Sequence, residues 1–330
     1  MQKATVLITA YERKNFVIQA INSVLNQTIN NFDILVVLSN TFHKDMFQEY
    51  NNRIKIIIDR DANDKCDLLA TGIKNIDTDI IMFLDDDDLY VKNKVEKIIN
   101  IFENDHSIGF IHNNYEKIYE NSNIDLNDSK LNNDGGILYI KSVQEALRND
   151  CDSNTSSISI KKDIITKYLP ILRSINGSDD TFFLYCALDS RKGIVQLRNK
   201  LTMYRIHKSG YTHIMGSYQQ YVIKNQEKLQ SDVTVHNIYL RNFKNKNLID
   251  IQKLRLYYYK TLLNNYIIPS GRIKGRKYIY DSIGYLKFIP YSGNHPPRFV
   301  KYLYFILMYI SIKLFIGINY LLGQYVLKGK

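Results

Sequence analysis

The sequence predicts an α/β fold, a mostly parallel sheet flanked by helices, followed by a C-terminal helical region. Between residues 4 and 112, apolar runs of strand length alternate with segments of helical spacing. One of these runs, residues 80–84, ends in four consecutive aspartates. After residue 216 the chain becomes basic, tyrosine-rich and mostly helical in pattern. We therefore expect two domains, residues 1–215 and residues 216–330.

Each element of the first domain follows from its apolar pattern. Short apolar runs rich in β-branched residues predict strands, and apolar residues three and four positions apart predict helices. The expected strands are 4–9, 33–38, 54–58, 80–84, 108–112, 156–160 and 194–205. The expected helices are 15–25, 64–75, 92–103, 161–168 and 180–188. Residues 115–136 are rich in Asn and Asp and predict a loop able to cover a substrate.

The composition of this 330-residue chain is that of a globular protein, with 45% hydrophobic and 23% charged residues. The formal net charge of +11 favours anionic partners, such as nucleotides, phospholipid surfaces or nucleic acid. Cys66, Cys151 and Cys186 are odd in number and far apart, so we expect neither a disulfide framework nor a zinc site. The first residues lack the pattern of a secretion signal, which favours a cytoplasmic location.

The four aspartates Asp85 to Asp88 predict a charged site at the end of a buried strand. In open α/β sheets, ligands bind at the carboxyl ends of the strands. Adjacent carboxylates repel one another, and a divalent cation carrying phosphates would neutralise them. The alternative is a solvated acidic turn that opens the following helix, where Asp is favoured.

The most apolar segment is residues 302–327, which Lys313 interrupts. Each side of this lysine is shorter than the roughly 20 residues that a membrane span requires. A lysine at the bilayer centre costs about 2.5 to 3.5 kcal/mol. We therefore expect an interfacial or partly inserted helical anchor on an anionic membrane surface, with the basic run Arg272 to Lys277 on the lipid headgroups. The alternatives are a buried core helix and an oligomer contact.

Three sequence blocks, Thr5 to Arg13, Ala20 to Thr28 and Phe83 to Leu89, resemble the family 2 glycosyltransferases of the GT-A fold. They occur in the family's order and at its usual spacing. Two shorter blocks, Gly177 to Asp180 and Tyr204 to His207, extend the resemblance over residues 3–215. The resemblance implies a nucleotide-diphosphate sugar donor and transfer of the sugar, with inversion, to an acceptor hydroxyl.

The resemblance also implies a metal site for Mg²⁺ or Mn²⁺. The family's Asp-x-Asp motif falls on Asp85, Asp86 and Asp87. Asp87 is expected to bind the metal directly, while Asp85 and Asp86 point toward the ribose and the water shell of the metal. Asp85 is also a candidate ligand, and so is His207, which matches a metal-binding position of some members. Asp88 is expected to support the site or cap the next helix.

The family's nucleotide pocket falls on Thr9, Ala10, Tyr11 and Glu12, at the end of the first strand. Tyr11 can equally be a core residue. Many relatives carry an arginine near the phosphates, and Lys65 is the residue that can replace it here. The chain departs from the family at residues 38–40, Leu-Ser-Asn, where relatives often carry acidic residues that contact the base.

The family's catalytic base falls on Asp180. A base opposite the leaving group has to take the acceptor's proton, and a helix start favours the ionised carboxylate that this requires. The alternative is that Ser178, Asp179 and Asp180 only cap the helix. Arg205 can pair with a phosphate or with an acidic residue of the fold.

The sequence as a whole predicts a metal-dependent inverting glycosyltransferase, peripheral or monotopic on the cytoplasmic face of the cell membrane. The apolar tail suggests a lipid-linked or cell-surface glycan acceptor and a role in polysaccharide biosynthesis. One rival is a phosphotransferase with an aspartate nucleophile, although such enzymes carry Asp-x-Asp after their first strand. The other is a nonenzymatic protein that binds nucleotides or nucleic acid. Nucleic acid is not expected as a partner, because the basic residues concentrate in the tail.

Overall fold

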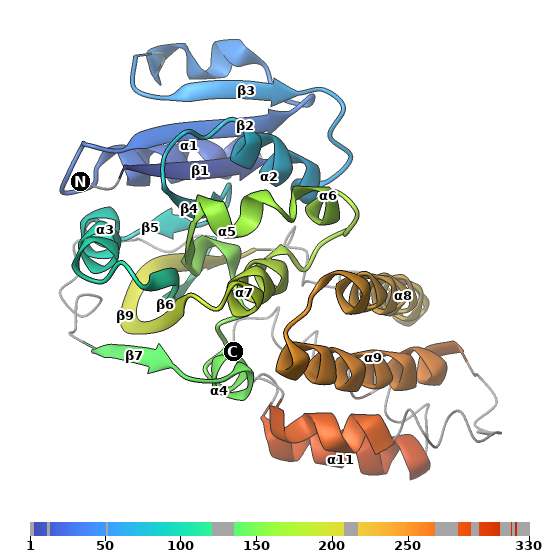
Figure 1. Ribbon diagram of the computed structural model, residues 1–330. Helices are drawn as coiled ribbons and strands as arrows, with labels where there is room; N and C mark the ends of the chain where they lie inside the picture. The colour runs from blue at the N-terminus through green and yellow to red at the C-terminus, as the bar shows by residue number, and fades with distance from the viewer. Residues whose placement is uncertain are drawn as a thin grey trace. The chain divides into compact units, whose positions relative to one another are not determined.

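The computed structural model describes residues 3–11, 14–50, 52–120, 135–207, 217–267, 283–291, 297–310, 318 and 321. The chain forms two compact units (Figure 1). The first unit consists of residues 1–142 and 151–206, and the second of residues 143–150 and 207–330.

A single mixed sheet organises the first unit. Its strand order is β3-β2-β1-β4-β8-β6-β9-β5, and β7 pairs with β9. The strands are β1 (Ala4–Ala10), β2 (Asp33–Ser39), β3 (Lys55–Asp59), β4 (Ile80–Asp85), β5 (Leu89–Tyr90), β6 (Ile108–Tyr119), β7 (Ile137–Ile140), β8 (Ile158–Lys161) and β9 (Gly193–Ile206).

The direction of the strands changes across the sheet. As predicted, β1 to β4 are parallel, and β6 is parallel to β9. In contrast, β8 is antiparallel to both of its neighbours, and β5 and β7 are antiparallel to β9. The sheet is therefore mixed, with parallel pairs among β1 to β4 and between β6 and β9, because an apolar run carries no information about strand direction.

Most helices of the first unit lie where the periodicity predicts them, but the short helix Leu169–Leu172 and the 3₁₀ segment Lys44–Tyr50 were not expected. The helices are α1 (Lys14–Leu25), α2 (Lys65–Lys74), α3 (Lys94–Asn104), α5 (Lys162–Thr166), α6 (Leu169–Leu172) and α7 (Asp179–Ser190), with 3₁₀ segments η1 (Lys44–Tyr50) and η3 (Thr155–Ser157). The expected loop at 115–136 begins later than predicted, since β6 continues to Tyr119. Residues 121–134 of that loop lie outside the described residues.

Helices cover both faces of the central strands. On one face of β1, Val6 and Ile8 join a buried cluster that includes Val17 and Ile21 of α1. On the other face, Leu7 lies against Gly72 of α2, where an added Cβ atom would come within 2.4 Å of a Leu7 methyl group. The core thus lies on both sides of the sheet, and the carboxyl ends of β1 and β4 are left to carry polar groups.

The second unit is helical among its described residues. Its elements are α4 (Val143–Arg148), α8 (Tyr218–Asn242), α9 (Lys246–Ile267), a helical turn at 283–288, η4 (Ile289–Tyr291) and α11 (Arg298–Ile310). α8 begins with a capping box in which the side chains of Ser217 and Gln220 bond each other's backbone N–H groups. α8 and α9 are joined by a short connection and pack against each other (Figure 1).

The expected membrane segment, residues 302–327, is described only in part. Its beginning belongs to α11, and residues 311–317, 319–320 and 322–330 lie outside the described residues. Within the part of the chain that the structure describes, no helix combines the length and the apolar character needed to cross a bilayer. This finding leaves the anchor a prediction.

Candidate active site

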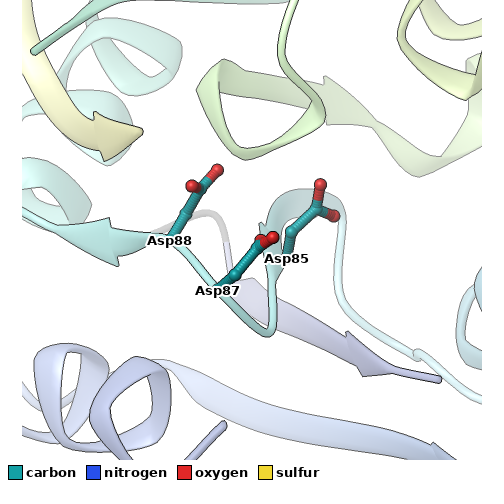
Figure 2. Close-up of side chains that lie close together, drawn as sticks. All are labelled: Asp85, Asp87 and Asp88. Atoms are coloured by element: carbon teal, nitrogen blue, oxygen red, sulfur yellow. The ribbon is translucent and has the colours of Figure 1, made fainter. Parts of the chain in front are cut away.

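Three carboxylates lie together on the turn that follows β4. One carboxylate oxygen from each of Asp85, Asp87 and Asp88 lies within 4.8 Å of those of the other two. Figure 2 shows their side chains projecting from the same short stretch of chain. Asp86, between them, has a fully buried side chain. The strand end predicted from the apolar run therefore does gather acidic groups.

This cluster fits a hard divalent cation. Carboxylate oxygens are the ligands that Mg²⁺ prefers, and they suit Mn²⁺ as well. Burial, followed by the charges of Asp87 and Asp85, raises the pKa of Asp88 well above its usual value. Burial also raises the pKa of Asp85. A bound cation would remove the cost of keeping these groups ionised so close together.

Arg205, on β9, braces the acidic turn. Its backbone N–H donates to Oδ1 of Asp88 at 2.9 Å, and its Nε donates to the carbonyl oxygen of Asp87 at 2.8 Å. Its guanidinium also bonds Gln19 of α1 and lies 4.7 Å from the centre of the Phe16 ring. The guanidinium of Arg205 thus bonds a backbone carbonyl and an amide of the fold, and its pairing with a phosphate stays a prediction.

Lys65, the first residue of α2, joins the acidic turn to the start of α7. Its Nζ lies 2.7 Å from Oδ1 of Asp85 and 2.9 Å from Oδ2 of Asp179, and it donates to the Thr155 hydroxyl at 3.1 Å. Burial opposes ionisation of Asp179, but Lys65 and the Thr155 hydroxyl outweigh it and lower the pKa of Asp179. Asp179 is thus held as a paired carboxylate.

Asp180, the next residue along α7, has a different environment. Burial, followed by the charge of Asp179, raises the pKa of Asp180 to about 7. Its Oδ1 accepts a hydrogen bond from the N–H of Thr181 at 2.7 Å. Gly177 and Ser178 turn the chain into the helix with positive φ angles of 79° and 57°, and the Ser178 side chain makes no capping bond. Ser178 therefore does not cap the helix through its side chain, and the role of Asp180 as a base stays a prediction.

The predicted nucleotide pocket lies beside the acidic turn. Thr9 and Asp85 are register partners in the pairing of β1 with β4, so the two strand ends meet. Thr9 and Ala10 are buried. The Tyr11 hydroxyl donates to the carbonyl oxygen of Asn63 at 2.6 Å, which fixes the side chain at the end of β1.

Residues 5–160 match the model of the glycosyl transferase family 2. This region of the chain belongs to that family. The match gives no support to the two rival interpretations of the acidic motif, the aspartate-nucleophile phosphotransferase and the nonenzymatic basic protein. The predicted family is confirmed.

Curated relatives agree with this assignment over part of their length. The chain is 34% identical over 122 residues to an uncharacterized glycosyltransferase of Rickettsia bellii, a match that covers 36% of this chain and 17% of the relative. It is 30% identical over 121 residues to the Escherichia coli UDP-Glc:alpha-D-GlcNAc-diphosphoundecaprenol beta-1,3-glucosyltransferase WfgD, covering 36% of this chain and 47% of the relative. The chain therefore spans less than half of either relative.

Solved structures share the fold. TarS 1–349 of S. aureus, in complex with UDP-GlcNAc, is similar with a TM-score of 0.57 and 11% identity, covering 97% of this chain and 92% of TarS 1–349. The mannosyltransferase PcManGT of Pyrobaculum calidifontis, in complex with GDP-Man and Mn²⁺, has a TM-score of 0.54 and 12% identity, with coverages of 86% and 75%. The predicted GT-A fold is confirmed.

The remaining predicted site residues of the glycosyltransferase domain stand as follows. Glu12 lies outside the described residues. His207 is buried and directly follows the last residue of β9, and its role as a metal ligand stays a prediction. Ser39, in place of a base-reading acid, donates its hydroxyl hydrogen to the carbonyl oxygen of Tyr11. The contacts of Lys65 and Asp86 with a nucleotide likewise stay predictions.

Sequence reasoning missed the polar groups that connect the acidic turn to α7. Thr155 and Ser156 belong to η3, and the only pattern they match is the N-glycosylation sequence Asn154-Thr155-Ser156, which we attribute to chance. Lys94 is fully buried. A signal for Lys94 was present, because it stands three residues after Val91 and four before Ile98, both of them buried. A lysine on an apolar helical stripe indicates a buried cation with a specific task.

Proposed function

We propose that the chain is a metal-dependent inverting glycosyltransferase that moves a sugar from a nucleotide-diphosphate sugar to an acceptor hydroxyl. The observation that carries the proposal is the connection through Lys65, which joins a cluster of metal-type carboxylates to the start of α7, where Asp180 has a pKa of about 7. Glycosyl transfer needs both groups, one for the leaving diphosphate and one for the acceptor proton.

Asp85, Asp87 and Asp88 would hold Mg²⁺ or Mn²⁺. The bound ion supplies charge that stabilises the nucleoside diphosphate as it leaves. Arg205 keeps the turn in place through the Asp87 carbonyl and the Asp88 carboxylate. The predicted pocket residues Thr9 and Tyr11 would position the nucleotide at the neighbouring strand end.

Asp180 would act as the general base. In a single displacement the acceptor oxygen forms a bond to the anomeric carbon, the bond from that carbon to the phosphate oxygen breaks, and the acceptor's proton passes to Asp180. A pKa of about 7 lets the carboxylate be ionised at neutral pH and still accept a proton readily. A single attack from the face opposite the leaving group inverts the anomeric configuration.

The names of the similar proteins support the substrate classes. Structures of TarS 1–349 in complex with UDP and UDP-GlcNAc, and of PcManGT in complex with GDP-Man, support a nucleotide-sugar donor. The name of WfgD specifies a diphosphoundecaprenol-linked acceptor. We infer a lipid-linked glycan acceptor for this chain too, and a place in polysaccharide biosynthesis.

One face of α11 supports attachment to an anionic membrane. Phe299, Tyr302, Leu303 and Ile306 are exposed by 71, 43, 48 and 52%, and their spacing places them on one side of the helix. Residues 207–330 carry 19 Lys and Arg but 4 Asp and Glu. An apolar helix face in a strongly basic region suits the interface of an anionic leaflet, and we infer a peripheral location on its cytoplasmic side.

Liposome sedimentation tests the membrane attachment. The double variant Phe299→Ser/Leu303→Ser should sediment less with vesicles containing anionic lipid than the parent chain does. Ile223→Ser, which removes a 54% exposed apolar residue from α8, is the matched control and should sediment like the parent. Equal sedimentation of all three proteins would exclude this face as the attachment site.

Donor binding tests the metal-dependent transferase. Purified protein is screened with Mn²⁺ or Mg²⁺ against UDP-, GDP- and dTDP-sugars, with thermal shift and sugar transfer as readouts. Stabilisation by one donor should require the metal and be lost in Asp87→Ala. Asp163→Asn, which changes an exposed carboxylate paired with Lys192, is the control. Donor binding that persists in Asp87→Ala, or without metal, would refute the metal-dependent mechanism.

A further inference from the structure

Lys94 is a fully buried lysine on the first turn of α3. Its Nζ donates to the carbonyl oxygen of Ser156 at 2.5 Å and to the hydroxyl of Thr202 at 2.8 Å. It also lies 3.9 Å from the centre of the Tyr90 ring. These contacts are two hydrogen bonds and one contact with an aromatic ring.

The contacts of Lys94 are with uncharged groups, and this burial is costly. Burial lowers the pKa of Lys94 well below its usual value, although the nearby charge of Asp88 opposes the effect. An apolar side chain at this place would avoid that cost. A buried lysine bonded to uncharged groups departs from the usual rule that buried charges are paired. Such a departure next to a candidate active site indicates a functional role for Lys94.

The partner of Lys94, the η3 turn, connects the two halves of the candidate active site. The Ser156 hydroxyl accepts a hydrogen bond from the N–H of Asp85 at 3.0 Å. The Thr155 hydroxyl donates to Oδ2 of Asp179 at 2.6 Å and accepts from Lys65. Consecutive residues of η3 thus contact the end of β4 and the start of α7.

Buried groups of α3 and β9 also bond the η3 turn. It begins after Asn154, whose φ of 54° is in the left-handed region. The Thr202 hydroxyl donates to the Ser156 carbonyl oxygen at 3.1 Å. The Lys94 side chain donates both to this carbonyl oxygen and to the Thr202 hydroxyl. Lys94 therefore links α3, η3 and β9 through buried hydrogen bonds.

We propose that Lys94 is a positioning residue for sugar transfer: it holds η3 and thereby fixes the separation between Asp85 and the Asp179–Asp180 pair. The proposal rests on the proposed function, since that separation matters because it sets the distance between the leaving group and the base. Misplacement of reacting groups by about 1 Å can cost on the order of 100-fold in rate.

The test compares Lys94→Met with the parent by two independent readouts. Amide hydrogen exchange reports the turn itself, because the N–H of Asp85 bonds Ser156 and the N–H of Ser157 bonds the Asn154 carbonyl at 2.8 Å. Both amides should exchange faster in the variant. Kinetics report the consequence: kcat should fall by about 10- to 100-fold, while KM for the donor stays within about twofold.

Asn113→Ala is the matched control. Asn113 is also fully buried. Its side chain donates to the Thr202 hydroxyl at 3.0 Å and to the Asn114 carbonyl oxygen, and not to a residue of η3. This variant should keep the exchange rates of the turn and the kcat of the parent. If Lys94→Met does not fold, Thr202→Val replaces it, because that variant keeps the lysine and removes its hydroxyl partner together with the bond from Thr202 to Ser156.

Each outcome decides a separate point. Unchanged amide exchange in a folded Lys94→Met variant would show that Lys94 does not hold η3. Faster exchange with unchanged kcat would show that η3 does not position the carboxylates. If kcat fell as much in Asn113→Ala as in Lys94→Met, the loss would be explained by general destabilisation of the buried core and not by η3. Absence of transfer by the parent would refute the proposed function, while the exchange experiment would still test Lys94.

Discussion

Replacing Asp180 by asparagine should change activity and stability in opposite directions. Asparagine keeps the size and the hydrogen-bond acceptor of the side chain but cannot take a proton. A general base typically contributes about 10²- to 10⁴-fold to the rate, so kcat for transfer should fall by that amount. This loss corresponds to about 3 to 5 kcal/mol of transition-state stabilisation. Donor affinity should change little, because Asp180 is not among the clustered metal-type carboxylates.

Stability should rise in the same variant at alkaline pH. The pKa of Asp180 is raised from 3.8 to about 7, so folding favours its protonated form. That contribution is fully present below pH 4 and is lost as the pH rises through 7. A pKa shift of about three units corresponds to about 4 kcal/mol of unfolding free energy. Because the Asp180 side chain is partly exposed, we expect the variant to gain about 2 kcal/mol. Asp180→Asn should therefore unfold like the parent at pH 4 and be more stable at pH 8.

Urea unfolding at these two pH values, together with transfer rates across the pH range, tests both halves of the prediction. For the parent, kcat/KM should increase with pH up to about 7 and then level off, since the base must be ionised. Full transfer activity in Asp180→Asn would refute its role as the base. A variant without activity that is also less stable at pH 8 would show that the carboxylate is needed for folding.

Two further predictions concern residues that hold the domain together. Lys65→Met removes the cation that pairs Asp85 with Asp179, and the loss of such a largely buried pair should cost about 2 to 4 kcal/mol, discounted for the 28% exposure of the lysine side chain. Chemical denaturation at pH 7 measures this cost, and a change near zero would contradict the pairing. Gly72→Ala places a methyl group against Leu7 and should destabilise the domain by about 1 to 3 kcal/mol of overpacking. Its unfolding midpoint would be unchanged if α2 could move away from β1 without cost.

The elements that sequence reasoning found share strong periodicity and burial. β1, β2 and β4 are continuous apolar runs with at most one exposed position each, and their predicted bounds differ from the observed ones by one residue. β5 has two residues and β7 has four, too few for a pattern to emerge. Their pairing with β9 depends on residues more than 50 positions away in the sequence, which a local pattern does not contain.

The candidate site was predicted where a motif is contiguous. Asp85 to Asp88 and the Asp179–Asp180 pair are read directly from neighbouring letters of the sequence. Lys65 and Asp179 are far apart in the sequence, and their 2.9 Å contact results from the tertiary fold. The same holds for Thr155, Ser156 and Lys94, whose residue types carry no signal of the groups that they contact.

Asp179 and Asp180 show most clearly what the fold adds to the motif. They are identical in type and adjacent in sequence, yet the pKa of the first is lowered and that of the second is raised to about 7. The two carboxylates differ in their surroundings. Lys65 and Thr155 bond Asp179, whereas Asp180 is partly buried beside the negative charge of Asp179. Because its partners keep Asp179 ionised, the negative charge of Asp179 helps to raise the pKa of Asp180. The same lysine that pairs with Asp179 also reaches Asp85, so one side chain connects the acidic turn with the start of α7.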